Sequence, residues 1–324
     1  MVQPLDVLTV GNALVDVIAR ENDEFLELVG VVKNSMTMVD EETALRIYDL
    51  MGPATEVSGG SAANTAVGVA AFGGNAGFIG RTRDDQVGDF FRHDIEAAGV
   101  RCAGGITTEG LATGRSYIIV TPDAHRTMCT YLGAANQLEV ADIPTGLVEA
   151  AAITYIEGYL WDQPAAKDAI REIGDRVAAA GNQFAFTLSD SFCVDRNREE
   201  FLDLIEHRFD IVFANEAELC SLFQTDDFDA AFEGIRARCD VVAVTRSEKG
   251  SILARGEEIV EIPAAPTDVV DTTGAGDLYA AGVLFGLTHG MSLAESGQHG
   301  AIAAAEVISH VGARPVTDLR TLIA

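Results

Sequence analysis

The stretch Asp271-Thr272-Thr273-Gly274-Ala275-Gly276-Asp277 runs directly into an apolar segment, Leu278-Tyr279-Ala280-Ala281-Gly282-Val283-Leu284-Phe285. This pattern predicts a glycine-rich turn that opens a helix. Gly274 and Gly276 lack Cβ, so the backbone can take positive φ and approach a ligand closely. The unpaired N–H groups and the dipole of a helix start favour an anion, of which phosphate is the usual example.

Asp277 stands on the first turn of this predicted helix. A carboxylate repels a phosphate unless it has a chemical task, and removing the proton of a substrate hydroxyl would be such a task. The alternative is an ordinary strand-to-helix connection with an aspartate near the cap. The spacing matches neither a Walker loop nor a dinucleotide fingerprint, because no Lys-Ser or Lys-Thr pair follows and no G-x-G-x-x-G is present.

Composition excludes several classes of protein. The chain has 324 residues, 48% of them hydrophobic, which suffices for one large domain with a smaller addition. A net charge of −28 disfavours nucleic acid and anionic membranes as partners. Five cysteines without a C-x-x-C spacing indicate reduced thiols in a cytoplasmic protein. We expect neither a signal peptide nor a membrane span.

Short apolar runs alternate with helical patterns along most of the chain. This alternation predicts an α/β fold with a parallel sheet covered on both faces. The predicted strands are Leu5–Val10, Ala76–Ile79, 153–156, 184–188, 211–214 and Val241–Thr245, and the predicted helices are 62–72, 87–98, 165–180, 199–207 and Glu216–Phe223.

Two segments, 14–40 and 105–132, depart from this rhythm. They alternate like exposed antiparallel strands, with Thr121-Pro122-Asp123-Ala124 as the turn between the last pair. We interpret them as a small β-sheet that projects as a lid from a body made of residues 1–13, 41–104 and 133–324. The same sheet would also suit a dimer clasp, so a monomer and a homodimer both stay open.

Three further motifs lie at predicted strand ends or helix starts, where ligands gather in open α/β sheets. Gly11-Asn12-Ala13-Leu14-Val15-Asp16 offers a carboxylate to two vicinal hydroxyls. Gly59-Gly60-Ser61-Ala62-Ala63-Asn64 permits close approach and offers an amide to a sugar hydroxyl. Asn215-Glu216-Ala217-Glu218 offers carboxylates to a hydrated Mg2+. Ordinary turns and helix caps explain each motif taken alone.

The segment Thr245-Arg246-Ser247-Glu248-Lys249-Gly250 follows a predicted strand and is able to cradle a nucleotide phosphate or ribose. An ordinary hairpin is the alternative, because 251–254 and Glu258–Ile262 have the pattern of its strands. No G-x-S-x-G elbow occurs, which argues against an α/β hydrolase.

Together, these motifs resemble the PfkB/ribokinase family of sugar and nucleoside kinases. Gly59-Gly60 with Asn64, Asn215-Glu216-x-Glu218 and the run 271–277 come in the family's order and spacing. The resemblance covers nearly the whole chain, and the run 271–277 is its most specific part. It implies a ribokinase-like three-layer sandwich with a mainly parallel central sheet and a small β lid.

Within the family, the sequence is most similar to adenosine kinases. Gly11-Asn12-x-x-x-Asp16 matches their ribose motif, and the segment 155–160 resembles their Tyr-Ile-x-Gly-aromatic-aromatic segment. Leu160 replaces the second aromatic residue there, which weakens the expected stacking on a purine. The segment 188–192 resembles their Leu-Ser-x-x-Phe segment, and 125–136 resembles their lid return.

The resemblance implies ATP-dependent phosphorylation of the 5′-hydroxyl of a ribonucleoside, with adenosine to AMP as the first expectation. A sugar kinase for ribose, fructose or a ketosugar acid is the alternative. Asp277 is implied as general base, the backbone of Gly274, Ala275 and Gly276 as an anion hole, and Arg126 as a lid residue on the phosphates. The implied substrate-binding residues are Asn12, Asp16, Met36, Met38, Gly59, Gly60, Asn64, Leu132, Leu160 and Phe192.

The resemblance also implies ATP, Mg2+ and a monovalent cation such as K+. Mg2+ is assigned to Glu216 and Glu218, and the monovalent cation to Asp271 with carbonyls near Val311 and Gly312. The residues implied on the ATP side are Asn215, Thr245, Arg246, Gly250, Thr273 and His299. A non-catalytic nucleoside- or sugar-binding protein is the competing class, and the intact run 274–277 argues against it.

Overall fold

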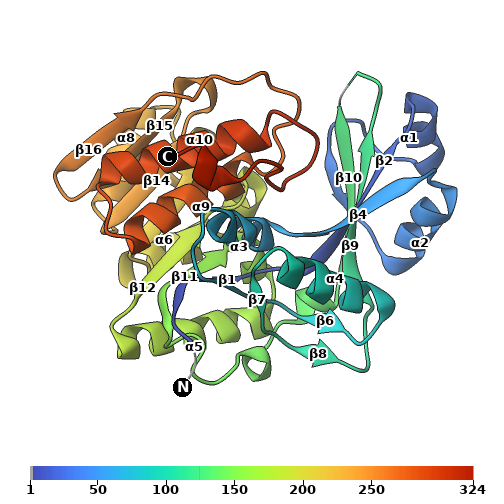
Figure 1. The fold of residues 1–324 in the computed structure, drawn as a ribbon, viewed down its shortest axis with the longest axis horizontal. Coiled ribbons are helices and arrows are strands. Elements are labelled where there is room, and N and C mark those ends of the chain that lie inside the picture. The colour runs from blue at the N-terminus through green and yellow to red at the C-terminus, as the bar shows by residue number, and fades with distance from the viewer. Residues whose placement is uncertain (1–2, 124, 324) are drawn as a thin grey trace.

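The body of the protein is built on a nine-stranded sheet (Figure 1). The computed structural model describes residues 3–123 and 125–323. Its strand order is β16-β15-β14-β13-β12-β11-β1-β5-β7, and every strand except β15 and β16 pairs in parallel. The strands are β1 (Leu5–Val10), β5 (Ala76–Ile79), β7 (Arg101–Cys102), β11 (Ala151–Glu157), β12 (Gln183–Thr187), β13 (Ile211–Asn215), β14 (Val241–Thr245), β15 (Ser251–Arg255) and β16 (Glu258–Ile262).

Helices cover both faces of this sheet, which makes three layers and confirms the predicted sandwich. One face carries α3 (Ser61–Ala71), α4 (Gln86–Ala97), α9 (Ala275–Thr288) and α10 (Leu293–Val307); the other carries α5 (Pro164–Ala180), α6 (Ser191–His207), α7 (Glu216–Phe223) and α8 (Phe228–Arg236).

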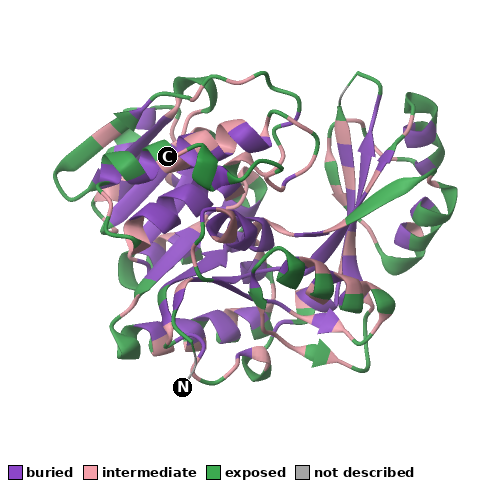
Figure 2. Ribbon diagram, in the orientation of Figure 1, coloured by how far each residue is buried: buried purple, intermediate pink, exposed green. Residues whose placement is uncertain are grey.

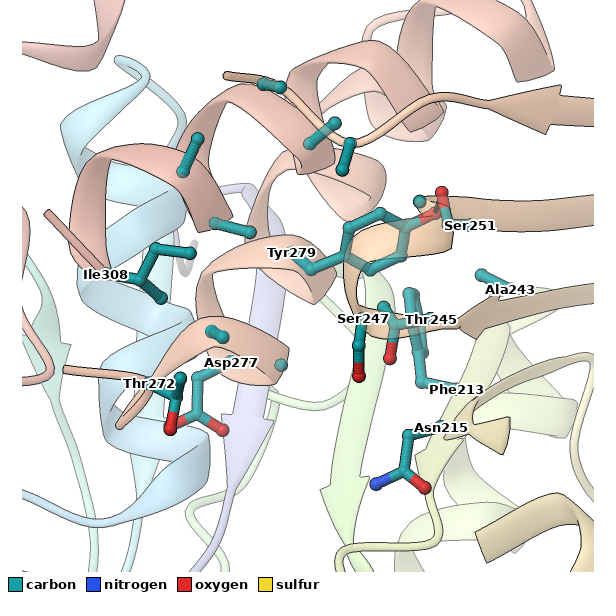
Figure 3. A pocket seen from close by; sticks show the side chains of 18 of the residues that line it. Phe213, Asn215, Ala243, Thr245, Ser247, Ser251, Thr272, Asp277, Tyr279 and Ile308 are labelled. Atoms are coloured by element: carbon teal, nitrogen blue, oxygen red, sulfur yellow. Dashed lines mark hydrogen bonds between the residues drawn. The ribbon is translucent and has the colours of Figure 1, made fainter. Parts of the chain in front are cut away.

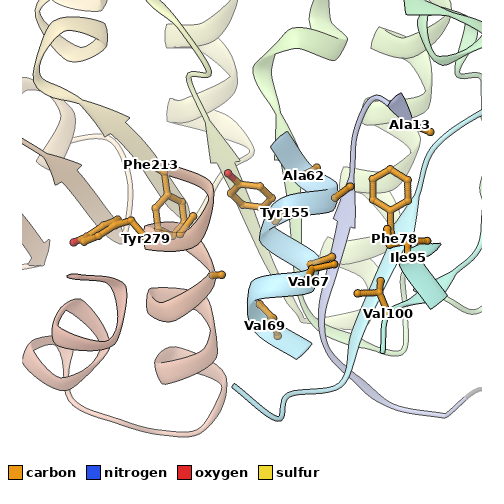
Figure 4. Close-up of a cluster of buried hydrophobic side chains, with 14 of the residues drawn as sticks. Ala13, Ala62, Val67, Val69, Phe78, Ile95, Val100, Tyr155, Phe213 and Tyr279 are labelled. Carbon is orange, nitrogen blue, oxygen red and sulfur yellow. The ribbon is translucent and has the colours of Figure 1, made fainter. Parts of the chain in front are cut away.

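The central strands are apolar on both sides because both faces are covered. In β13, Ile211 and Phe213 face the α3 and α9 side, while Val212 and Ala214 face the opposite layer. Figure 2 shows the buried residues filling the sheet and the inner faces of the helices. Figure 4 shows the packing on the α3 side, where Tyr155 lies beside α3, and Phe213 and Tyr279 follow on the far side of Tyr155.

A second sheet of five strands, in the order β3-β10-β9-β2-β4, stands beside the body. Two helices, α1 and α2, cover its outer face (Figure 1). Its elements are β2 (Leu14–Arg20), α1 (Asp23–Val29), β3 (Met36–Met38), α2 (Glu41–Leu50), β4 (Ala54–Gly59), β9 (Thr113–Val120) and β10 (Arg126–Gly133). A separate pair, β6 (Thr82–Arg83) and β8 (Ile106–Thr107), lies nearby.

The structure differs from the sequence prediction in this smaller unit. Asn22 accepts a hydrogen bond from the Phe25 backbone N–H at 3.0 Å and starts helix α1 where strands were expected. Strand β2 pairs in parallel with β9, so the sheet is mixed. Residues 41–59, which we placed in the body, form α2 and β4 against this sheet. β4 escaped detection because its mostly exposed sequence lacks an apolar pattern.

Strands β9 and β10 form the predicted antiparallel pair, joined through Thr121, Pro122 and Asp123. Ala124, the last residue of the predicted turn, lies outside the described residues. All five cysteines are free thiols. In the part of the chain that the structure describes, no helix combines the length and the apolar character that crossing a membrane requires.

The aromatic core behind β12 gives a stability prediction. Phe186 is 1% exposed, stacks on Phe209 at 4.5 Å between ring centroids and meets Phe201 edge-on at 5.0 Å. We expect Phe186→Ala to lower the free energy of unfolding by about 3–5 kcal/mol in a urea titration. Phe192→Ala is the control, because Phe192 is 75% exposed, and it should change this free energy by less than about 0.5 kcal/mol. Equal effects would contradict the described core.

Candidate active site

Asp277 lies on the first turn of α9, which begins at Gly274 with a φ of 80°. Its Oδ1 accepts a hydrogen bond from Ser61 Oγ at 2.6 Å, and its Oδ2 accepts one from Asn64 Nδ2 at 2.9 Å. Burial raises the pKa of Asp277, and the two hydrogen bonds and the charge of Arg314 offset part of this rise. The start of α3 therefore holds both oxygens of the predicted base.

A cavity of about 770 Å³ opens beside Asp277. Figure 3 shows Asp277 and Thr272 on one side, with Asn215 and Thr245 across from them. The ends of β13 and β14, the loop 263–270, and the facing sides of α9 and α10 enclose it. Its lining includes Ser61, Ser189, Asn215, Glu218, Thr245, Gly250, Ser251, Ala264, Ala275, Gly276, Asp277, Tyr279, Ala304 and Ile308.

Several residues predicted for the nucleotide side thus lie at the cavity, while three others lie away from its lining. His299 belongs to another face of α10, where its ring packs on Phe72 at 5.7 Å and on Phe285 at 6.1 Å between centroids. Thr273 and Arg246 are not among the residues that line the cavity. The helix face that does line the cavity carries Ala301, Ala304, Ala305 and Ile308, small or apolar residues that no motif singled out.

Glu216 and Arg246 form an ion pair at the rim. Arg246 Nε lies 3.0 Å from Glu216 Oε2, and Lys249 Nζ lies 3.3 Å from Glu216 Oε1. The hydrogen bond from Arg246 holds the pKa of Glu216 below its usual value. The Arg246 guanidinium also lies 3.8 Å from the centre of the Phe228 ring. Glu216, which was predicted to bind Mg2+, and Arg246, which was predicted on the ATP side, therefore both contact other protein side chains. These contacts stabilise the rim of the cavity.

Glu218 lines the cavity and caps its own helix. The Asn215 backbone N–H donates to Glu218 Oε2 at 3.0 Å, and the Glu218 backbone N–H donates to Asn215 Oδ1 at 2.8 Å. This reciprocal pair is a capping box. Burial, with the nearby charges of Asp190 and Asp277, raises the pKa of Glu218 to about 7. Carboxylate oxygens are preferred ligands of Mg2+, so Glu218 at the cavity fits a hydrated Mg2+.

Both carboxylate oxygens of Asp271 are engaged by protein donors. Its Oδ1 accepts from the backbone N–H and the hydroxyl of Thr273 at 3.1 and 2.9 Å, and its Oδ2 accepts from the Gly312 N–H at 3.0 Å. Arg126 Nη2 lies 2.7 Å from the same Oδ2. The carbonyls near Val311 and Gly312 are the remaining oxygens of the implied K+ site, which stays a prediction. Among the described residues, no group of three metal-binding side chains is assembled.

Arg126 joins the smaller sheet to the glycine-rich loop. Besides the ion pair with Asp271, its Nη1 donates to Thr273 Oγ1 at 3.3 Å. Burial lowers the pKa of Arg126. The structure thus places this predicted phosphate contact at the base of the loop 271–277, and its action on phosphates stays a prediction.

Asp16 lies in the middle of β2 on the face turned toward the body. A Cβ on Gly59 would lie 2.4 Å from the Asp16 carboxylate, so only glycine leaves room for this side chain. Burial raises the pKa of Asp16 to about 7 against the charges of Arg314 and Arg126. Close approach at Gly59 is therefore a packing requirement of the predicted ribose-binding residue.

The strand register places Met38 in the same cross-strand row as Asp16. Asp16 pairs with Ser116, Ser116 with Thr130, and Thr130 with Met38, and paired residues share one face of a sheet. The hydroxyls of Ser116 and Thr130 lie 2.9 Å apart. This lid row therefore runs from a carboxylate through two hydroxyls to an exposed thioether. Met36 and Leu132 occupy neighbouring rows of the same face.

Leu160 and Phe192 do not join this surface. Leu160 is 3% exposed and packs in the core on the α5 and α6 side of the sheet. Phe192 is 75% exposed on the first turn of α6. Neither lines the cavity, and their implied contacts with the substrate stay predictions.

Asn12 is held by Glu157, a residue that sequence reasoning passed over. The backbone N–H and the Nδ2 of Asn12 donate to Glu157 Oε1 at 2.7 and 2.6 Å, and the Ala62 N–H donates to Glu157 Oε2 at 3.0 Å. Burial raises the pKa of Glu157 to about 7. Glu157 lies between the ends of β1 and β11, where strand order reverses, and an acidic residue ending a buried strand was its signal.

The fold and this site define a phosphotransferase of the α/β class with a β lid. The chain belongs to the pfkB family of carbohydrate kinases, whose model matches residues 7–319. Adenosine kinase of Saccharomyces cerevisiae is 31% identical over 337 aligned positions that cover 96% of each chain. The structure of adenosine kinase from Sinorhizobium meliloti shares 50% identity and a TM-score of 0.92, with 98% of each chain covered. A probable sugar kinase from Rhizobium etli shares 48% identity and a TM-score of 0.92, with 99% of this chain and 98% of the other covered.

The two glutamates of the Asn-Glu-x-Glu motif give a testable contrast. Glu218 faces the cavity, whereas Glu216 is neutralised at the rim. We expect Glu218→Gln to lower kinase turnover by about 10- to 100-fold and to raise the Mg2+ concentration needed for half-maximal rate. Glu216→Gln is the matched control and should alter turnover by less than about threefold, because its surface ion pairs contribute little. A larger loss of turnover and a larger rise in the required Mg2+ concentration for Glu216→Gln than for Glu218→Gln would contradict this assignment.

Proposed function

We propose that the protein transfers the γ-phosphoryl group of ATP to the 5′-hydroxyl of a ribonucleoside, with adenosine as the preferred acceptor. The observation that carries this proposal is the position of Asp277, which stands at the wall of a nucleotide-sized cavity. Asp16 and the rest of the lid row lie on the other side of Asp277. The charge of Asp277 raises the pKa of Asp16, so the two carboxyl groups are close. ATP as phosphoryl donor and a ribonucleoside as acceptor would therefore both lie next to the Asp277 carboxylate.

In the proposed step, the acceptor hydroxyl gives its proton to Asp277 while its oxygen bonds to the γ-phosphorus. The bond between that phosphorus and the bridging oxygen breaks, and ADP leaves. Ser61 Oγ now makes the hydrogen bond to Oδ1 that the acceptor hydroxyl would need. Asn64 keeps the other oxygen in place. The backbone N–H groups at 274–276, at the positive end of α9, stabilise charge on the transferring group.

Mg2+ would be held beside Glu218 and would neutralise charge on the ATP phosphates. The cavity wall supplies the remaining contacts to ATP, with Thr245 and Gly250 on its sheet side. The small residues of α10 leave room for a flat base.

A neutral acceptor suits the charge around Asp277. Asp16, Glu157 and Asp277 are carboxylates, and Arg314 and Arg126 are the cations that act on Asp16. This negative balance disfavours a sugar acid. Met38, in the row of Asp16, offers an adaptable apolar surface to a purine. The likeness to two adenosine kinases supports adenosine, while the probable sugar kinase from Rhizobium etli keeps ribose or fructose as the second candidate.

A screen of acceptors with purified protein, ATP and Mg2+ tests the proposal, with ADP release as the measurement. Adenosine should give the highest kcat/KM among nucleosides, ribose and fructose. A higher kcat/KM for a free sugar would replace adenosine with the second candidate. If no acceptor gives ADP release, the protein would instead be a non-catalytic nucleoside- or sugar-binding protein.

Asp277→Asn tests the base directly. We expect kcat for the preferred acceptor to fall by about 10²- to 10⁴-fold, because the amide cannot accept the proton. The affinity for ATP, measured by calorimetry, should stay within about threefold. The control is Asp318→Asn, whose carboxylate pairs with Arg320 on the surface and which should keep full turnover. Near-normal turnover of Asp277→Asn would remove the assigned base.

Asp16→Asn tests the grip on the ribose. Wild-type protein should prefer adenosine to 2′-deoxyadenosine, because a carboxylate accepts hydrogen bonds from vicinal hydroxyls. In the variant this ratio of kcat/KM values should fall toward one. An unchanged ratio would mean that the 2′-hydroxyl is bound elsewhere.

A further inference from the structure

Arg314, in the segment after α10, ties the end of the chain to the lid. Its Nη2 donates to the Ser58 carbonyl and, at 3.2 Å, to Ser58 Oγ. Ser58 in turn donates from its backbone N–H and its hydroxyl to Asp94 Oδ2, at 2.8 and 2.6 Å. Ser58 lies in β4, and the next residue is Gly59. Arg314 therefore adds a contact from the C-terminal segment to the end of β4, which also pairs with β2 and ends at Gly59.

This link brings the guanidinium next to the acceptor-binding carboxylate. Asp16 lies directly over Gly59, the neighbour of the residue that Arg314 binds. Of the charges that oppose the effect of burial on Asp16, that of Arg314 is the largest. Burial lowers the pKa of Arg314 to about 10, so its side chain remains charged at neutral pH.

The same charge acts on the predicted base. Among the described residues, Arg314 and Arg126 are the cations that act on Asp16, and Arg314 is the cation that acts on Asp277. The other groups around Asp277 are neutral donors or further acids. They are Ser61 and Asn64 from α3, Tyr155 and Glu157 from β11, Tyr159, Asp16 from β2, and Glu218 from α7.

We propose that Arg314 is a positioning residue for phosphoryl transfer, which holds β4 in place through Ser58 and supplies the positive charge that keeps Asp16 and Asp277 as carboxylates. The inference rests on the proposed function. It explains how two acids can sit in one buried site and still act as hydrogen-bond acceptors. An acceptor with a neutral ribose adds no charge of its own, so the compensation must come from the protein.

Two variants separate the charge from the hydrogen bonds. Arg314→Gln keeps a donor for Ser58 and removes the charge, whereas Arg314→Lys keeps the charge and loses the planar fork. The measurement is the single-turnover rate of the chemical step with adenosine, ATP and Mg2+, followed from pH 5.5 to 9.5. Circular dichroism verifies that each variant is folded.

A positive charge lowers the pKa of a neighbouring carboxyl, so its loss raises that pKa. In Arg314→Gln, the acid limb of the rate profile should therefore move to higher pH by about one unit or more, with much of the rate restored at pH 9. Arg314→Lys should keep the limb near its wild-type position. Arg320→Gln is the control, because Arg320 pairs with Asp318 alone and should leave the profile unchanged.

A rate that falls equally at every pH in Arg314→Gln would show that Arg314 serves the packing of β4 only, and would overturn the proposal. A limb that moves equally in the Lys variant would overturn it as well. If Arg314→Gln does not fold, Arg314→Met takes its place, because it also removes the charge, and the same shift of the limb is expected. Failure of the proposed function is distinct, since wild-type protein would then show no turnover with adenosine.

A second measurement isolates Asp16. In an Asp277→Asn background, adenosine affinity can be titrated against pH without turnover. Adding Arg314→Gln should shift the loss of affinity at low pH upward by about one unit. If the curve of adenosine affinity against pH does not shift, Arg314 acts on Asp277 alone. That result would overturn the proposed role of Arg314 toward both Asp16 and Asp277.

Discussion

The site depends on the contact between the first turns of α3 and α9. Ser61 and Asn64 donate to the two oxygens of Asp277, and Thr65 Oγ1 donates to the Asp277 carbonyl at 3.2 Å. Small residues of α3, such as Ala62 and Ala66, are fully buried and allow the helices to pack closely. This contact orients the Asp277 carboxylate toward the region between the cavity and the lid.

Buried charge is the second constraint on this arrangement. Several acids converge where the strand ends, the lid and the helix starts meet, and burial raises their pKa values. The protein compensates with arginines that come from distant parts of the chain. Arg126 reaches the loop 271–277 from the lid, and Arg314 reaches β4 from the C-terminal segment. Arg126 therefore links the lid to the loop 271–277, and Arg314 links the C-terminal segment to β4.

The sequence predicted the body well because local patterns determine it. The bounds of β1, β5, β14 and α7 match their predicted ranges, since buried strands and capped helices leave local signatures. The lid was harder, because β4 and α2 gain their place from pairing with distant strands. Ser61, Glu157 and Arg314 were missed as site residues, because their partners lie 216, 145 and 256 positions away along the chain. His299, which the resemblance implied on the ATP side, lies outside the cavity lining and packs on Phe72, and its contact with ATP stays a prediction.

The position of the acceptor hydroxyl relative to Asp277 can be tested in a single experiment. A crystal structure of the protein with adenosine and a non-hydrolysable ATP analogue should show the 5′-hydroxyl within hydrogen-bond distance of Asp277 Oδ1. Ser61 Oγ, which now lies 2.6 Å from that oxygen, should have given up this hydrogen bond. A 5′-hydroxyl bound elsewhere, with the Ser61 to Asp277 hydrogen bond still in place, would contradict the assignment of Asp277 as the base.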